Sequence, residues 1–308
     1  MQQLKIFSPA TVANVSCGFD ALGFAIDTVG DEMVFKITSG KEIKISRITG
    51  AELPYEIEKN AASVVALAML EKAGADFGLD IEIHKKVKPG SGLGSSASSS
   101  AGAAFAVNEL LGKPFSLLEL TAFARIGEKI ACGSPIADNV AAAIYGGFIL
   151  VRSYEPLEIV KLPVPDNLYV TIIHPQIEIK TSDARDVLKP EIPIALSVKQ
   201  SANMAGLVSG LFTSDYKLIS RSLEDVIAEP YRKALIPEFD AIKKRGLAAG
   251  ALGVGISGSG PAIFALCEGE KAAREVAGAI EDVYQGTGIE SILYTSKINL
   301  QGVQIVSS

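Results

Sequence analysis

Cysteine is scarce in this sequence. The three cysteines, Cys17, Cys132 and Cys267, lie far apart and form no C-x-x-C pair. An odd number of isolated cysteines favours neither a disulfide framework nor a zinc site, so we expect a reducing, cytoplasmic setting. With 308 residues, the chain is long enough to bury the core of one large or two modest domains without cross-links.

Long apolar runs and an excess of basic residues are also lacking. The most apolar stretches, 61–70 and 141–151, end well before the roughly 20 residues of a membrane span. The residues after Met1 show neither the basic head nor the apolar stretch of a signal peptide. The formal net charge of −6 argues against a nucleic-acid binder, which needs a concentrated basic face. We therefore expect a soluble protein with no membrane partner and no nucleic-acid partner.

Strands and helices are mixed along the chain. Alternating apolar positions predict strands over 4–10, 32–39, 42–48, 79–87, 146–152, 168–175, 253–259, 262–267 and 290–298. Helical patterns cover 61–74, 116–131, 194–211, 215–227, 238–248 and 270–284. The elements lack the regular alternation of a doubly wound sheet, which favours an α+β fold. A proline-bearing stretch suggests two domains, 1–155 and 156–308.

A glycine-rich segment carries the most specific motif. Residues 89–98 read PGSGLGSSAS and stand between a predicted strand and a helix built of small residues. Glycines let backbone amides approach a ligand, serines add hydroxyl groups, and a helix N-terminus attracts anions. The segment is neither a Walker A loop, which ends in Gly-Lys-Ser/Thr, nor a Rossmann fingerprint, because Ser95 replaces the third glycine. A flexible Gly/Ser linker is the alternative, but the flanking strand and helix favour a phosphate-binding loop.

Residues 89–97 resemble the phosphate loop of the GHMP kinases, and two other segments resemble that family as well. Residues 8–27, SPATVANVSCGFDALGFAID, are similar to its N-terminal motif, and residues 253–266, GVGISGSGPAIFAL, to its C-terminal glycine-rich motif. The latter contains G-x-G-x-x-G, but Pro261 and a strand follow where a dinucleotide site requires a helix. The resemblance implies a ribosomal-protein-like N-terminal domain with the phosphate loop and a ferredoxin-like C-terminal domain.

The resemblance also implies ATP and Mg²⁺ as cofactors. The predicted nucleotide-binding residues are Asn60, Pro89, Gly90, Ser91, Gly92, Leu93, Gly94, Ser95 and Ser96. Glu128 and Ser96 match the positions that hold Mg²⁺, a hard cation suited to carboxylate oxygen. Taken alone, Glu128 would be read as an exposed helical acid beside Lys129, and Asp138 with Asn139 as a helix cap.

Within the family, the acceptor side most resembles the homoserine kinases. The residues matched to substrate binding are Asn14, Asp20, Asn139, Arg185 and Arg232. The arginines suit a carboxylate and Asp20 suits an ammonium. The predicted catalytic residues are Asn139, Asp138 and Glu128, with Asn139 holding the hydroxyl and Asp138 a base in some relatives. Ile136 stands where homoserine kinases often have a histidine, and we expect His84 and His174 to be structural and without partners.

The implied reaction is the ATP-dependent phosphorylation of the side-chain hydroxyl of L-homoserine to O-phospho-L-homoserine, a step of threonine biosynthesis. Another GHMP kinase, acting on mevalonate, a sugar or shikimate, is the first alternative. An RNA-binding module is an alternative of a different class, because the N-terminal fold is shared with translation proteins, although the acidic balance speaks against it. The sequence leaves the oligomeric state open, and a homodimer is compatible with it.

Overall fold

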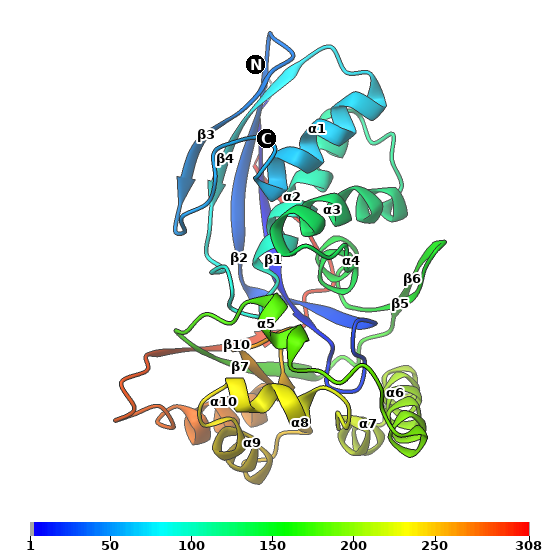
Figure 1. Ribbon diagram of the computed structural model, residues 1–308, viewed down its shortest axis with the longest axis vertical. Helices are drawn as coiled ribbons and strands as arrows, with labels where there is room; N and C mark the ends of the chain where they lie inside the picture. Colours follow the sequence, from blue (N-terminus) through cyan, green and yellow to red (C-terminus); the bar gives the residue numbers. More distant parts are fainter. Residues whose placement is uncertain (1–2, 308) are drawn as a thin grey trace.

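The computed structural model describes residues 3–307, which form two β-sheets with helices packed against them (Figure 1). The seven strands of the first sheet are β1 (Gln3–Ala13), β2 (Leu22–Thr38), β3 (Ile43–Thr49), β4 (Gly78–His84), β5 (Phe148–Tyr154), β6 (Leu157–Leu162) and β11 (Gln304–Ser307). The main order is β11-β1-β2-β4-β3, with β5 paired to β2 and β6 to β5. The strands β1 and β2 form a long antiparallel pair that carries residues of the N-terminal motif toward the second sheet.

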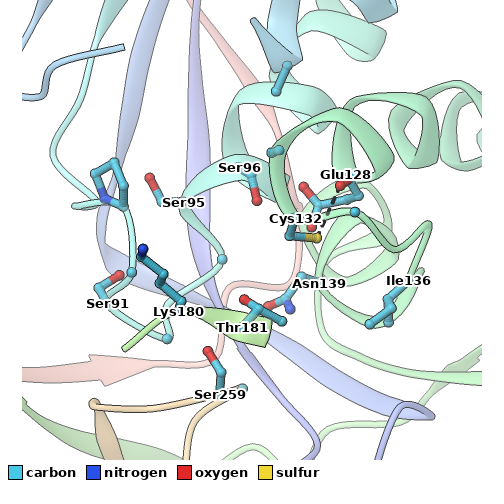
Figure 2. Close-up of a pocket in the computed structure, with 18 of the residues that line it drawn as sticks. Ser91, Ser95, Ser96, Glu128, Cys132, Ile136, Asn139, Lys180, Thr181 and Ser259 are labelled. Carbon is cyan, nitrogen blue, oxygen red and sulfur yellow. Dashed lines mark hydrogen bonds between the residues drawn. The ribbon is translucent and has the colours of Figure 1, made fainter. Parts of the chain in front are cut away.

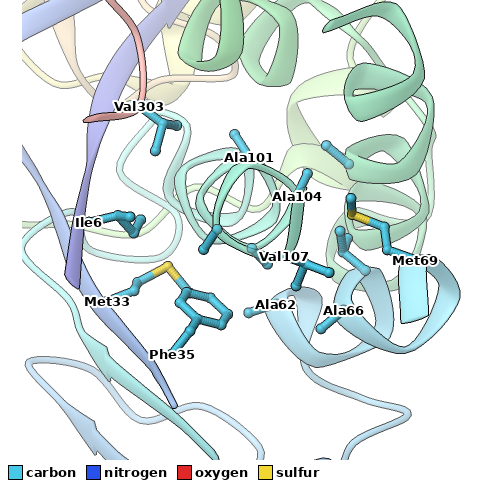
Figure 3. Packing of buried hydrophobic residues seen from close by; sticks show 14 of the residues in the cluster. Ile6, Met33, Phe35, Ala62, Ala66, Met69, Ala101, Ala104, Val107 and Val303 are labelled. Carbon is cyan, nitrogen blue, oxygen red and sulfur yellow. The ribbon is translucent and has the colours of Figure 1, made fainter. Parts of the chain in front are cut away.

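Helices cover one face of this sheet (Figure 1). They are α1 (Ala61–Ala73), α2 (Ser95–Leu110), α3 (Leu117–Cys132) and α4 (Asp138–Tyr145). The central helix α2 is built of small residues, so that it packs closely between the sheet and α1 (Figure 3). A Cβ added at Gly102 of α2 would lie 2.8 Å from the sulfur of Met33. Close packing of this kind fixes α2 and therefore the loop at its N-terminus.

Local signals in the sequence set several helix ends. The side chain of Asn60 accepts a hydrogen bond from the Ala62 N–H at 3.0 Å, and α1 ends at Gly74 with φ 63°. Ser116 and Glu119 form a capping box at the start of α3. These side chains satisfy N–H groups that a helix leaves free at its N-terminus. The predicted bounds of both helices are confirmed within about one residue.

The second sheet is antiparallel and has the order β10-β7-β9-β8. Its strands are β7 (Leu168–Pro175), β8 (Gly253–Ile256), β9 (Ile263–Glu268) and β10 (Ser291–Lys297). Helices α9 (Phe239–Ala248) and α10 (Glu270–Ile280) pack against it. A helical crossover joins β7 to β8, a hairpin joins β8 to β9, and α10 joins β9 to β10, which is the ferredoxin-like β-α-β-β-α-β arrangement. The predicted α+β, two-domain fold is confirmed.

Several elements were not predicted or have different bounds. The crossover from β7 to β8 also contains α5 (Thr181–Asp186), α6 (Ile194–Thr213), α7 (Tyr216–Ser222), α8 (Glu229–Arg232) and a 3-10 turn (Lys233–Leu235). Helix α7 ends at Ser222, five residues short of the predicted limit. Sheet membership crosses residue 155, because β6 and β11 belong to the first sheet. The division at residue 155 stays a prediction. Within residues 3–307, no helix combines the length and apolar character needed to cross a membrane.

Candidate active site

The predicted site residues gather around one cavity of about 660 Å³ between the two sheets. The residues that line it include Asn14, Asp20, Asn60, Pro89, Gly90, Ser91, Gly92, Gly94, Ser95, Ser96, Glu128, Asp138, Asn139, Arg185 and Arg232. Leu93 is the exception, because its side chain is 2% exposed and packs in the core. Segments from both ends and the middle of the chain therefore converge on one site.

The glycine-rich loop bends sharply before α2. Gly90, Gly92 and Gly94 have φ values of 67°, 78° and 68°, which L side chains rarely adopt. Gly94 precedes α2, so the N-terminus of that helix opens into the cavity next to Ser95 and Ser96. The Ser95 hydroxyl donates to the carbonyl of Val87 at 2.6 Å, so it fixes the loop internally. The backbone amides and the start of α2 are donor groups of the kind that bind anions.

The C-terminal glycine-rich motif packs directly on this loop. The Ser257 hydroxyl donates to the carbonyl of Gly92 at 2.7 Å, and the Ala262 N–H donates to the carbonyl of Ser91 at 3.1 Å. A Cβ on Gly92 would lie 2.5 Å from the Ser257 carbonyl oxygen and 2.7 Å from that of Gly260. The motif therefore supports the phosphate loop from the second sheet, and the need for glycine there is steric.

A buried ion pair supports the loop from the first sheet. Lys85, which is 4% exposed, pairs with Asp31 and donates to the Ser95 carbonyl at 2.7 Å and to the Ser99 hydroxyl at 3.1 Å. Asp31 also accepts from the N–H of Lys86 at 2.8 Å. Mutual neutralisation and hydrogen bonds offset part of the cost of burying both charges. The pair ties β2 and the end of β4 to the first turn of α2.

Glu128 lies on α3 beside Ser96 of α2 (Figure 2). Its side chain is nearly buried, and its Oε1 has no hydrogen-bond partner among the described residues. Burial raises the pKa of the Glu128 carboxyl to about 7, while the Ser96 hydroxyl and the charge of Lys85 oppose the rise. A buried carboxylate oxygen without a partner is costly unless a ligand satisfies it. Glu128 and the hydroxyl of Ser96 thus form an oxygen donor set that fits Mg²⁺.

Asp138 and Asn139 open α4 at the side of the cavity. Burial raises the pKa of the Asp138 carboxyl to about 7, the charge of Asp20 adds to the rise, and the Asn139 N–H opposes it. The Asn139 side-chain oxygen accepts a hydrogen bond from the Thr11 hydroxyl at 2.7 Å. Thr11 therefore fixes the amide group, with its nitrogen on the opposite side from Thr11. Sequence reasoning missed Thr11, which lies within the N-terminal motif.

At the wall of the same cavity, Asp20 and Arg185 form a charge pair. Arg185 Nη2 lies 3.1 Å from both carboxylate oxygens of Asp20, and the two side chains are 39% and 31% exposed. Asp20 has φ 54°, and its N–H donates to the side-chain oxygen of Asn14 at 2.9 Å. Asn14, Val15 and Ser16 also have positive φ, so the N-terminal motif makes a strained left-handed turn that presents Asp20 to the cavity.

Arg232 is 4% exposed and bound by backbone groups. It donates to the carbonyl of Ala184 at 2.8 Å and to that of Gly258 at 3.0 Å. The guanidinium groups of Arg185 and Arg232 lie 5.7 and 5.0 Å from the ring centre of Phe19, which holds them together at the wall of the cavity. The structure therefore brings together the two arginines that the sequence predicted for a carboxylate.

The expectation that both histidines lack partners is wrong. His84 Nδ1 lies 2.9 Å from the Thr49 hydroxyl, and His174 Nδ1 lies 3.1 Å from the side-chain nitrogen of Gln176. Neither histidine is among the residues that line the cavity, and their structural role stays a prediction. Ile136, which stands where the family resemblance suggests a histidine, does line the cavity. Other lining residues that sequence reasoning missed include Lys59, Lys85, Lys180 and Thr181.

Two family models match the chain. The model described as GHMP kinases N terminal domain matches residues 58–147, and that described as GHMP kinases C terminal matches residues 207–286. The first match contains the phosphate loop, Glu128 and Asn139, and the second contains Arg232 and the C-terminal glycine-rich motif. The chain belongs to the GHMP kinase family.

Named relatives match over the whole chain. A homoserine kinase of Chloroherpeton thalassium is 44% identical over 319 residues, which cover 99% of this chain and all of the relative. One of Chlorobium phaeobacteroides is 43% identical with the same coverage. The crystal structure of homoserine kinase from Cytophaga hutchinsonii is 50% identical, has a TM-score of 0.96, and matches 99% of this chain and 98% of that one.

Proposed function

We propose that this protein is a homoserine kinase, which transfers the terminal phosphoryl group of ATP to the side-chain hydroxyl of L-homoserine. One observation carries the proposal: Asp20 and the two arginines line the same cavity as the phosphate loop, with Asn139 also at its wall. A carboxylate and paired guanidinium groups complement the ammonium and carboxylate of an amino acid. Relatives named homoserine kinase over the full chain length support the same acceptor.

The phosphate loop suits the nucleotide in this proposal. Its backbone amides and the N-terminus of α2 offer donors to phosphate oxygens. Glu128 and Ser96 would hold Mg²⁺, and the ion would neutralise charge on the phosphates. Phosphoryl transfer requires the protein to position the reactants and to stabilise charge, and it requires little covalent chemistry from the protein. The described residues supply both without a nucleophile of their own.

Asn139 would place the acceptor hydroxyl. Because Thr11 occupies the side-chain oxygen and one amide hydrogen points to Asp138 at 3.4 Å, the second amide hydrogen is the one that Asn139 would donate to the hydroxyl oxygen. The hydroxyl oxygen then attacks the terminal phosphorus, the bond to the leaving ADP breaks, and the proton passes to a phosphate oxygen. This account needs no carboxylate base, although Asp138 lies next to Asn139. A cytoplasmic location and a homodimer remain expectations.

The test is a panel of acceptors with ATP and Mg²⁺, followed by ADP release and by phosphorus NMR of the product. L-Homoserine should stimulate ADP release far more than mevalonate, galactose or shikimate, and O-methyl-L-homoserine, which lacks the hydroxyl, should give no phosphorylated product. Equal or faster turnover of mevalonate would refute homoserine as the acceptor and leave a GHMP kinase of another specificity.

A further inference from the structure

The phosphate loop of this protein lacks a cation. Residues 89–96 contain no lysine or arginine, whereas Walker-type phosphate loops end in a lysine that contacts the terminal phosphates of the nucleotide. Backbone amides carry only partial charges, and a terminal phosphoryl group in transfer is best stabilised by fixed positive charge close to it. A side-chain cation that does this beside Mg²⁺ has to come from another segment of the chain.

Five cationic side chains line the cavity, and most of them are already engaged. The engaged side chains are Lys59, Lys85, Arg185 and Arg232, which bond to Glu56, to Asp31, to Asp20 and to backbone carbonyls. The fifth is Lys180, and its ammonium forms no ion pair or hydrogen bond within residues 3–307. Lys180 is therefore the cation of the cavity that can bind a ligand without first breaking an existing ion pair or hydrogen bond.

Lys180 also lies next to the phosphate loop. It precedes α5, and the adjoining backbone lies against the first turn of the phosphate loop, where the Ile179 N–H contacts the carbonyl of Gly90 at 3.4 Å. A Cβ on Gly90 would collide with the side chain of Glu178. In Figure 2 the ammonium of Lys180 extends toward the loop, between Ser91 and Ser95.

Two further contacts hold this segment in position. Ile179 is 7% exposed and packs in the core of the second sheet. Lys88, which immediately precedes the phosphate loop, donates to the side-chain oxygen of Gln176 at 2.7 Å. The segment 176–180 is thus anchored to both the second sheet and the loop, so that the base of the Lys180 side chain is fixed while its ammonium remains free.

We propose that Lys180 binds the terminal phosphates of ATP and acts as the cation that the phosphate loop itself lacks. The assignment rests on the proposed kinase function, and it adds a catalytic residue from a segment that packs beside the phosphate loop. A lysine that arrives from the second sheet also makes correct docking of the two sheets a condition for phosphoryl transfer.

The experiment compares Lys180→Met with Lys86→Met, which removes an exposed lysine near the loop that does not line the cavity. Kinetics give kcat and KM for ATP, and calorimetry gives Kd for AMP, ADP and a non-hydrolysable ATP analogue. Lys180→Met should lower kcat/KM for ATP by about 10–100-fold, the usual effect of one lost charge-assisted hydrogen bond. It should weaken the ATP analogue and ADP more than AMP, and Lys180→Arg should recover part of the loss.

The proposal is overturned if Lys180→Met leaves the kinetics and all three affinities at wild-type values, or if Lys86→Met causes an equal loss. An equal loss for AMP and for the ATP analogue also overturns it, because a terminal-phosphate contact would spare AMP. The binding measurements need no acceptor. A wild-type protein that fails to phosphorylate L-homoserine would refute the proposed acceptor, whereas the difference between Lys180→Met and Lys86→Met would still decide the role of Lys180.

Discussion

Arg185 donates from Nη2 to both carboxylate oxygens of Asp20, so that residues 165 positions apart form one charge pair at the wall of the cavity. An amino acid carries the same two charges and can exchange partners with this pair, its ammonium going to Asp20 and its carboxylate to the arginines. An acceptor with a carboxylate alone would leave Asp20 without a cation. The pair therefore favours a zwitterion over a simple hydroxy acid.

Asp20→Asn should reduce the preference for a zwitterionic acceptor over a simple hydroxy acid. We expect kcat/KM for L-homoserine to fall by about 10–100-fold, in line with the loss of a charged hydrogen bond. The value for 4-hydroxybutyrate, which has the hydroxyl and the carboxylate but no ammonium, should change much less. Asp186→Asn, an exposed neighbour of the site that does not line the cavity, is the matched control. An unchanged ratio between the two acceptors in Asp20→Asn would show that Asp20 does not recognise the ammonium.

Glu128→Gln should lower kcat severely and shift the magnesium titration of activity to higher concentration. A neutral amide is a poor ligand for a hard cation, and the buried Oε1 of Glu128 has no other partner among residues 3–307. The control is Glu71→Gln, which neutralises an exposed carboxylate on α1. A magnesium titration that coincides with the wild-type curve would remove Glu128 from the metal site.

The buried carboxylates also predict a pH dependence of stability. Burial raises the pKa values of Glu128 and Asp138 to about 7 from the ordinary 4.5 and 3.8, so the folded chain keeps protons that the unfolded chain has lost. Their contribution to the free energy of unfolding is therefore largest below about pH 4 and declines as pH rises toward 7. Urea unfolding without magnesium or nucleotide should show a smaller decline from pH 5 to pH 8 for Glu128→Gln than for the wild type. Parallel curves would contradict this linkage.

Gly92→Ala should damage the nucleotide site through steric contact. Its φ of 78° is unfavourable for alanine, and the added Cβ would lie 2.5 Å from a backbone oxygen of the C-terminal motif. We expect KM for ATP to rise at least about tenfold, with a loss of stability beyond the roughly 1–2 kcal/mol of a left-handed alanine. Gly112→Ala is the matched control, since Gly112 has φ 83° but no atom within 4 Å of its added Cβ. Equal effects of the two substitutions would mean that backbone strain alone matters at Gly92.

The phosphate loop could be predicted because the residues that give it its binding groups are neighbours in the sequence. Glycines, serines and a helix start stand within ten residues, and each acts through its own backbone. The partners of the loop are different, since Lys85 and Asp31 are 54 positions apart and are joined only by the pairing of β2 with β4. Lys180 had no local signal at all, because nothing in its sequence neighbourhood shows that it faces the loop.

Some elements exist only through tertiary contacts. The four residues of β11 become a strand by pairing with β1, at the far end of the chain, and no local pattern marks them. Helix α7 was predicted to continue to 227, but Asp225 accepts hydrogen bonds from the N–H groups of Ile227, Ala228 and Glu229 and so holds the segment before α8 in a turn. Periodicity could not reveal that a side chain would compete for these N–H groups.

Substitutions of Asn139 and Asp138 distinguish two mechanisms: one in which Asn139 positions the acceptor hydroxyl, and one in which Asp138 acts as a general base. If Asn139 orients the hydroxyl, Asn139→Ala should reduce kcat strongly, and Thr11→Val should do so in part, because Thr11 fixes the Asn139 amide through a 2.7 Å hydrogen bond. Asp138→Asn should be milder, since it keeps the size of the side chain and an oxygen that can accept from the Asn139 N–H, as Asp138 does at 2.7 Å.

If Asp138 is the general base, Asp138→Asn should be the more damaging substitution and Asn139→Ala the milder one. Because the pKa of Asp138 is about 7, a base mechanism would give a rate that rises through neutral pH and a loss of roughly 10²–10⁴-fold in kcat for Asp138→Asn. We expect instead that the wild-type rate above pH 6 shows no ionisation that Asp138→Asn removes. The pH profiles of kcat for the wild type, Asp138→Asn and Asn139→Ala, with nucleotide and homoserine affinities measured alongside, separate the two mechanisms. If Asp138→Asn abolishes turnover with both affinities intact while Asn139→Ala is nearly silent, the aspartate is the base and the positioning account is wrong.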